Sequence, residues 1–120
     1  MVNSKEASFA YLETLSDEQL CAACQTGNRN AEEVLAARYH RLVRSIARPY
    51  FLAGGDNEDL LQEGMVGLIK AMREYDPGQS ASFCTFAETC IRRRLYSVLR
   101  AAASGKHLPL NQAVPLDTSF

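Results

Sequence analysis

The sequence of 120 residues lacks the long apolar stretches and leader patterns that mark membrane and secreted proteins. No stretch approaches the roughly 18 consecutive apolar residues of a membrane-spanning helix. The N-terminus has no basic segment followed by an apolar one, the pattern of a signal peptide. We therefore expect no membrane contact and a cytoplasmic location. No alternation of apolar and polar residues predicts a strand, and there is no internal repeat or low-complexity segment.

Signatures of catalysis and of cofactor binding are also missing. The sequence has no phosphate-binding glycine loop, no Ser, His and acid in a catalytic order, and no Glu-x-x-His ligand pair on a helix. We expect no enzymatic activity, no cofactor and no metal site.

The four cysteines leave one alternative open. Cys21 and Cys24 form a C-x-x-C pair, but the pair falls in a predicted helix without the turn of a zinc knuckle, and Cys84 and Cys90 do not supply a second pair of that spacing. Buried free thiols in a reducing cytosol explain these residues better. The alternative function is a small helical regulatory or interaction module with a cysteine-based metal or redox sensor.

Charge is unevenly distributed along a chain whose net charge is only −1. Residues 34–53 hold four arginines and no acid, whereas residues 54–76 hold six acids and two basic residues. The remainder, 77–120, is basic again, with five basic residues and two acids. Alternating blocks of this kind suit a protein with one basic and one acidic partner.

Apolar residues at helical spacing predict an all-α, compact helical domain. We expect three main helices, over residues 31–52, 57–75 and 83–103, and a short N-terminal helix over 17–26. Ser16 with Gln19, and Asn30 with Glu33, are predicted capping boxes, and Pro49 should kink or end its helix. Residues 1–14 form a tail, either a short helix or a frayed end. The domain spans 15–107, and 108–120 begins a linker.

The stretch from Asp56 to residue 100 organises the rest of the chain. Asp56 can cap the acidic helix, in which Gly64 and Gly67 indicate close approach of a neighbouring backbone. Ser82 can cap the next helix, whose apolar stripe includes Phe83. Another face of that helix carries arginines around an aromatic residue, which indicates either a nucleic-acid surface or a solvated amphipathic helix.

The order of residues in this stretch resembles region 2 of the sigma-70 family of bacterial RNA polymerase sigma factors. The run 59–64, DLLQEG, is followed by Gly67-Leu68 and Lys70-Ala71, and the likeness continues through Phe83, Thr85, Phe86, Ala87, Ile91 and Arg92. The runs 86–94 and 106–111 are closest to the sporulation and stationary-phase sigma H group. In that family a linker and a second DNA-binding domain follow, and the second domain is absent from this sequence.

The resemblance implies an alternative sigma factor domain that binds core RNA polymerase and recognises and helps to melt the −10 promoter element. Its docking face on the clamp helices of the largest polymerase subunit would comprise Asp59, Gln62, Glu63 and Met65. An anti-sigma factor is a possible further partner.

The resemblance also implies a DNA-binding set on the helix that follows, in duplex and in non-template single strand: Phe83, Phe86, Thr89, Arg92, Arg93, Tyr96 and Arg100. Arg93 and Tyr96 fall where the family reads duplex, and Phe86 is favoured over Phe83 for the flipped-out base because Phe83 also fits the apolar stripe. Arg92, Arg94 and Arg100 would contact phosphates.

One departure from the family concerns promoter melting. Primary members carry two adjacent tryptophans where this chain has Thr89-Cys90, which favours an alternative factor with stringent promoter demand. Two explanations of the basic helix stay open, since Arg38, Arg41, Arg44 and Arg48 either pair with neighbouring acids or approach the displaced strand.

Overall fold

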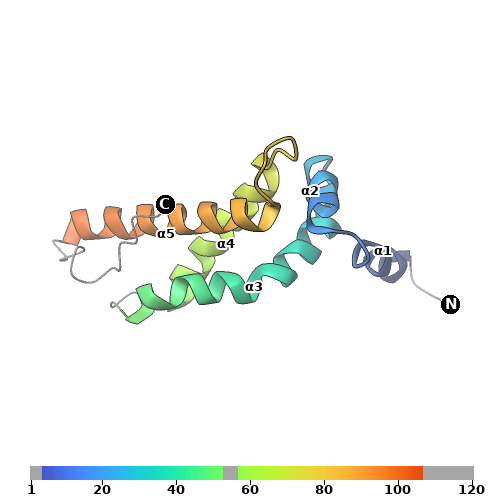
Figure 1. Ribbon diagram of the computed structural model, residues 1–120. Coiled ribbons are helices and arrows are strands. Elements are labelled where there is room, and N and C mark those ends of the chain that lie inside the picture. The colour runs from blue at the N-terminus through green and yellow to red at the C-terminus, as the bar shows by residue number, and fades with distance from the viewer. Residues whose placement is uncertain (1–3, 53–56, 107–120) are drawn as a thin grey trace.

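Five helices make up the computed structural model, which describes residues 4–52 and 57–106 (Figure 1). They are α1 (Ser4–Leu12), α2 (Asp17–Gln25), α3 (Arg29–Leu52), α4 (Asn57–Glu74) and α5 (Phe83–Lys106). The described ranges contain no strand, and the predicted all-α fold is confirmed. Of the two alternatives for the N-terminal segment, the structure has the helix. The predicted Asp56 cap and the linker over 108–120 lie outside the described residues.

Local sequence explains where the short second helix begins and ends. The Ser16 hydroxyl accepts from the Gln19 backbone N–H, and the Gln19 side chain accepts from the Ser16 N–H, so the predicted capping box is present. Gly27 ends the helix with a φ of 98°, a left-handed conformation that glycine adopts without steric cost.

The start of α3 differs from the prediction, whereas its end agrees with it. Asn28, not Asn30, lies at its start, and the Asn28 side chain accepts from the Ala31 N–H at 3.1 Å. Asn30 is already inside the helix, so its N–H and side chain are not at the cap position. Pro49 lies inside the helix, which continues to Leu52 as predicted, so of the two alternatives for Pro49 the ending of the helix is wrong. The last helix runs to Lys106, three residues beyond the predicted 103.

The core forms where α3, α4 and α5 pack against one another. In Figure 1, α3 and α5 run roughly alongside each other and α4 crosses behind them. Each of the three contributes fully buried side chains, among them Leu35, Val43, Leu68, Met72, Phe83, Ile91 and Leu95. Together with the buried Tyr39 and Ala87, these residues recur every four positions within each helix, which is why one face of each helix is withdrawn from water.

Two glycines let α4 approach its neighbours closely, and the predicted approach of a neighbouring backbone is confirmed at Gly67 but not at Gly64, where the nearest atoms belong to side chains. A Cβ at Gly64 would lie 2.6 Å from Val43 Cγ1 of α3. A Cβ at Gly67 would lie 3.1 Å from both the Cys90 carbonyl oxygen and the Ile91 Cα of α5. Arg94 Cβ lies 3.0 Å away as well. Because the other two atoms belong to the backbone, they cannot rotate away, and α4 packs directly against the backbone of α5 at this point.

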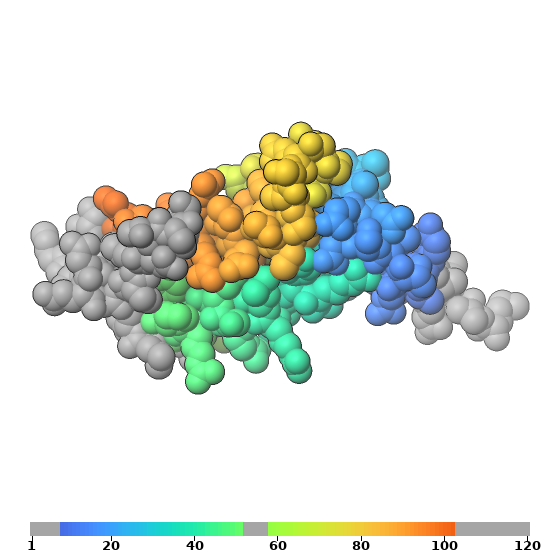
Figure 2. Space-filling view, in the orientation of Figure 1, coloured from blue at the N-terminus to red at the C-terminus, as the bar shows by residue number. Residues whose placement is uncertain are grey.

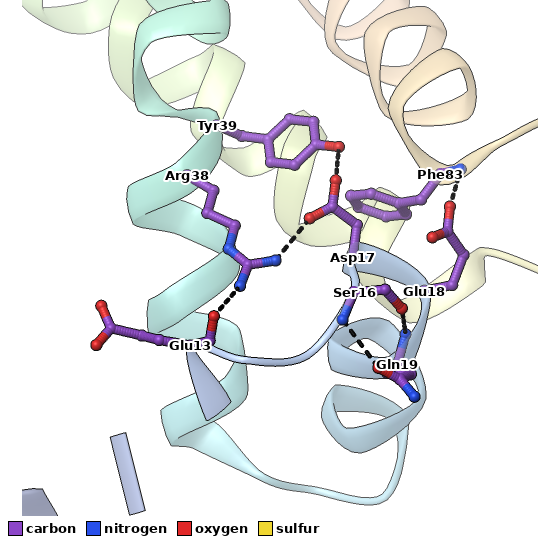
Figure 3. Close-up of polar contacts among 8 residues, drawn as sticks. All are labelled: Glu13, Ser16, Asp17, Glu18, Gln19, Arg38, Tyr39 and Phe83. Atoms are coloured by element: carbon purple, nitrogen blue, oxygen red, sulfur yellow. Dashed lines mark hydrogen bonds and ion pairs between the residues drawn. The ribbon is translucent and has the colours of Figure 1, made fainter. Parts of the chain in front are cut away.

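The short helix α2 fastens both sides of the turn between α4 and α5. Glu18 accepts a hydrogen bond from the Phe83 N–H at the start of α5, at 3.0 Å (Figure 3). Gln25 donates from Nε2 to the carbonyls of Met72 and Tyr75 at the end of α4, at 3.1 and 2.8 Å. These partners satisfy backbone groups that helix ends leave unpaired.

Asp17 ties the start of α2 to α3. Its carboxylate accepts from the Tyr39 hydroxyl and forms an ion pair with Arg38, at 2.9 Å, while Arg38 also donates to the Glu13 carbonyl (Figure 3). Burial, and next the Asp17 hydrogen bond, raise the pKa of Tyr39, so the hydroxyl stays protonated as the donor.

Candidate functional site

The outer face of α4 carries the residues predicted to dock on polymerase. Asp59 and Gln62 are exposed, and Glu63 is half-buried on the neighbouring side of the helix. Met65 differs from them, because its side chain packs partly against the core. The structure therefore brings three of the four residues together on the solvent side, with Met65 at the edge.

The Glu63 carboxylate is already engaged within the domain. Its Oε1 lies 2.7 Å from Nη2 of Arg94 and 2.8 Å from Nε, so the arginine of α5 binds it through two nitrogens. Arg94 was expected to contact phosphate, and in this conformation its guanidinium is paired with Glu63 instead. The pair is partly exposed, with 43% of the Arg94 side chain accessible, so it contributes at most about 1 kcal/mol to stability.

Sequence reasoning missed an apolar part of the same face. Val66 is 45% exposed, one of two large hydrophobic side chains that stand out among the described residues. It lines a hollow of about 370 Å³ with Ile69, Lys70, Arg73 and Glu74. Val66 follows Gln62 by four residues and so lies on the same face of the helix. An apolar residue within this polar stripe was the sequence signal that could have indicated an exposed apolar contact.

One face of α5 carries most of the predicted DNA-binding residues. Phe86, Thr89, Arg93, Tyr96 and Arg100 recur at intervals of three and four residues, so they form one stripe about 21 Å long. All five are exposed or half-buried. The helix thus presents an aromatic ring near its start and basic side chains along its remainder.

Phe83 is not part of that stripe, which corrects its assignment to an accessible DNA-binding surface. Its side chain is 0% exposed, and its ring packs edge-on against Tyr39 and Tyr75 with centroids 5.4 and 5.5 Å apart. Phe83 fits the apolar stripe of α5, and burial of its ring determines its role. The Phe86 ring also packs against Tyr75, with ring centroids 5.7 Å apart, but the Phe86 side chain stays partly exposed.

The arginines of α5 differ in whether their side chains have partners within the domain. Arg92 pairs with Glu88 one turn earlier, at 2.9 Å. Arg100 donates to the Tyr96 hydroxyl at 3.1 Å and lies over its ring, 5.6 Å from the centroid. Arg93 is exposed, and within residues 4–52 and 57–106 no ion pair or hydrogen bond of its side chain is found.

Thr89 and the cysteines bear on the remaining expectations. The Thr89 hydroxyl donates to the Thr85 carbonyl one turn earlier, at 3.2 Å.

Burial raises the pKa of the Cys21 and Cys24 thiols to about 11, so at neutral pH both stay as unreactive thiols. Across the described part of the chain, no group of three or more His, Cys, Asp and Glu side chains could hold a metal ion. None of the described helices is long and apolar enough to cross a membrane.

The all-α core, the polar outer face of α4 and the arginine-bearing stripe on α5 agree with the predicted helical domain of the sigma factor class. The family described as Sigma-70 region 2 matches residues 35–104, which include α4, most of α3 and nearly all of α5. The chain belongs to the sigma-70 family.

Curated relatives support the predicted likeness to the sigma H group. The chain is 43% identical over 103 residues to the RNA polymerase sigma-H factor of Bacillus licheniformis, covering 86% of this chain and 46% of that protein. Identity to the sigma-H factor of Bacillus subtilis is 42%, covering 86% and 47%. The FliA sigma factor of Pseudomonas aeruginosa is 42% identical over 77 residues, covering 60% and 30%. The chain spans about half the length of the sigma-H relatives. No solved structure gives a significant match.

Proposed function

We propose that this domain acts in transcription initiation as the region of an alternative sigma factor that docks on core RNA polymerase and recognises and helps to melt the −10 promoter element. The observation that carries the proposal is the exposed stripe on α5, with Phe86 near its start and Arg93, Tyr96 and Arg100 beyond. Arginine pairs with guanine in the major groove of duplex DNA, whereas an aromatic ring stacks on an unpaired base.

The stripe supports a division of roles along α5. Arg93 has no competing partner among the described side chains, so it can reach a base edge. Arg100 is held over Tyr96, which fixes the guanidinium beside the aromatic ring and suits a phosphate contact. Phe86 lies at the other end, where the strand separated from the duplex would be captured.

The outer face of α4 supports docking on the clamp helices of the largest polymerase subunit. Asp59 and Gln62 offer polar contacts, and Val66 adds an exposed apolar patch at their side. Interfaces combine a desolvated apolar centre with a polar rim, and this face has both parts.

Thr89 supports the assignment to an alternative rather than a primary factor. Its short side chain is bonded back to its own helix and cannot stack against the end of a duplex. Strand separation would therefore depend on favourable promoter sequence, with Phe86 capturing the base.

The test uses holoenzyme assembled from this chain and core polymerase, on promoters matched and mismatched at the upstream base pair of the −10 element. Arg93→Ala should lose discrimination by about 1–3 kcal/mol, the value of a bidentate base contact. Phe86→Ala should spare duplex binding and weaken capture of the unpaired strand. Exposed Arg29, outside both faces, supplies the control Arg29→Ala. Equal losses on both promoters for Arg93→Ala contradict base reading.

Docking is tested with a pair of variants that share one structural effect. Glu63→Lys and Arg94→Ala both break the Glu63–Arg94 ion pair, but only the first removes the carboxylate. If Glu63 contacts polymerase, Glu63→Lys should weaken core binding and Arg94→Ala should not. Wild-type affinity of both Glu63→Lys and Gln62→Ala would show that the assigned face is wrong.

A further inference from the structure

A groove between α1 and α3 belongs neither to the docking face on α4 nor to the stripe on α5. It has a volume of about 450 Å³ and is lined by Phe9, Glu13, Glu33, Val34, Ala37 and Arg38. In Figure 2, α1 and α2, in blue, lie toward one end of the molecule, and the later part of α5, in orange, lies toward the other.

The floor of the groove is apolar. Val34 and Ala37 are three residues apart on α3 and so lie on one face of that helix, and Phe9 of α1 lines the groove with them. Val34 is buried and Phe9 packs partly against the core, whereas Ala37 is exposed because its methyl group is too short to fill the space. An apolar side chain from another molecule would bury surface against all three.

The rim of the groove carries negative charge. Glu13 and Glu33 are exposed, and neither forms an ion pair with any side chain in the described ranges. Arg38 does not neutralise them, because its guanidinium is paired with Asp17 and donates only to the backbone carbonyl of Glu13. Of the two explanations that the sequence left open for the arginines of α3, pairing with an acid is thus confirmed for Arg38.

We propose that this groove binds a basic amphipathic helix of a regulatory protein other than the polymerase. When a helix binds in a groove, an apolar anchor side chain enters the space between the flanking elements, and here Phe9, Val34 and Ala37 surround that space. Lys or Arg side chains one turn before and after the anchor lie on the same face of the bound helix and would meet Glu13 and Glu33. The same carboxylates repel phosphates, so the groove favours a protein over a nucleic acid.

The side of α3 on which the groove opens separates its occupant from the polymerase. Glu32 extends toward α4, where its carboxylate lies 3.9 Å from Arg73. Glu33 follows directly and lines the groove, and successive residues of an α-helix are about 100° apart, so the groove and α4 lie on different sides of α3. A second protein can therefore bind while α4 is docked. This choice of partner rests on the proposed docking face, whereas the choice of a basic helix does not.

The test measures the fluorescence anisotropy of a labelled peptide mixed with the full chain. The probe is an Ala-rich helical peptide about four turns long, with Leu at its centre and Lys four residues before and after it. One matched peptide has Glu in place of both Lys, and another has the Lys two residues from the Leu, on the opposite face. The chain should bind both matched peptides at least about tenfold more weakly than the probe.

A substitution in the floor of the groove tests the place of the anchor. Ala37→Gln fills the groove from an exposed helical position and should weaken binding of the probe roughly tenfold or more. Ala22→Gln makes the same change at an exposed alanine of α2 and should leave the affinity unchanged. Thermal unfolding of each variant shows that the fold is retained.

A pair of double variants tests the charged rim. Glu13→Gln with Glu33→Gln removes both carboxylates and should weaken binding of the probe roughly fivefold, the value of two exposed ion pairs. Glu58→Gln with Glu74→Gln removes the same charge from exposed positions of α4 and should leave the affinity unchanged.

Three results would overturn the groove as the site of a basic helix. They are wild-type affinity of Ala37→Gln for the probe, equal losses in the two double variants, and no binding of the probe by the wild-type chain at about 1 mM. Core polymerase should bind Ala37→Gln as it binds the wild type, and weaker binding would mean that the polymerase itself supplies the helix. Failure of the docking face, which Glu63→Lys and Gln62→Ala test, would leave the peptide results unchanged.

Discussion

The two halves of α5 differ in how firmly contacts with the rest of the domain hold them, although they belong to one continuous helix. The first turn is fixed from several sides, because Glu18 binds the Phe83 N–H and the Phe83 ring is enclosed by Tyr39 and Tyr75. The second half, from Tyr96 onward, has no fully buried side chain among its described residues: Leu99 packs partly against the core, and Arg100 interacts with Tyr96 of its own helix. The contrast separates anchoring from contact: one end places the helix, and the other is free to meet a partner.

A similar contrast holds between two phenylalanines within the first half of α5. Phe83 and Phe86 are one turn apart, yet one is enclosed and the other remains accessible. Substitutions should therefore change different quantities: the free energy of unfolding at the enclosed residues, and DNA binding at the accessible ones.

The largest effect is expected at Phe83. Phe83→Ala removes a fully buried ring and leaves a cavity among Tyr39 and Tyr75, and it should lower the free energy of unfolding by roughly 3–5 kcal/mol. Urea unfolding followed by circular dichroism measures it. If the variant does not fold, Phe83→Leu should fold with a smaller loss. A loss below about 1 kcal/mol for Phe83→Ala would mean that the ring is not enclosed.

A smaller effect is expected at the hydrogen bond that anchors α5 to α2. Glu18→Ala leaves the Phe83 N–H without its acceptor and should lower the free energy of unfolding by about 1–2 kcal/mol. Glu18→Gln keeps an oxygen acceptor but loses the charge near the positive end of the helix dipole, and it should cost less, roughly 0.5–1 kcal/mol. Equal stability of the two variants and the wild type in urea would remove Glu18 from the anchor.

The smallest effect on stability is expected at the far end of the helix. Arg100→Ala removes an exposed side chain whose partner is Tyr96 and should change the free energy of unfolding by no more than about 0.5 kcal/mol. In holoenzyme it should weaken all promoter sequences alike and reduce the salt slope by about one unit. A stability loss as large as that of Glu18→Ala would mean that the second half of α5 is anchored too.

Much of the fold could be predicted because its signals are local. The Ser16–Gln19 capping box, the break between the helices predicted over 57–75 and 83–103, and the stripe on α5 each depend on residues within a few turns of one another. Asn28 was missed as a cap because Asn30 followed by Glu33 resembles a capping box more closely in sequence.

What could not be predicted depends on contacts between distant segments. Glu18 and Phe83 are 65 residues apart, and nothing in either neighbourhood indicates the other. The same applies to Glu63 and Arg94, each of which looks free for a partner until α4 and α5 are placed together. The choice between core and surface for Phe83 likewise required Tyr39, which comes from another helix.

The contact at Gly67 has a consequence for the genetics of this domain. Because α4 rests directly on the backbone of α5 there, a side chain at residue 67 would have to push the two helices apart. Gly67 belongs to neither proposed contact set. In a screen for loss of transcription, substitutions such as Gly67→Val would nevertheless score as defects in polymerase binding and in promoter recognition at once. Such an allele reports the spacing between two surfaces rather than the loss of either one.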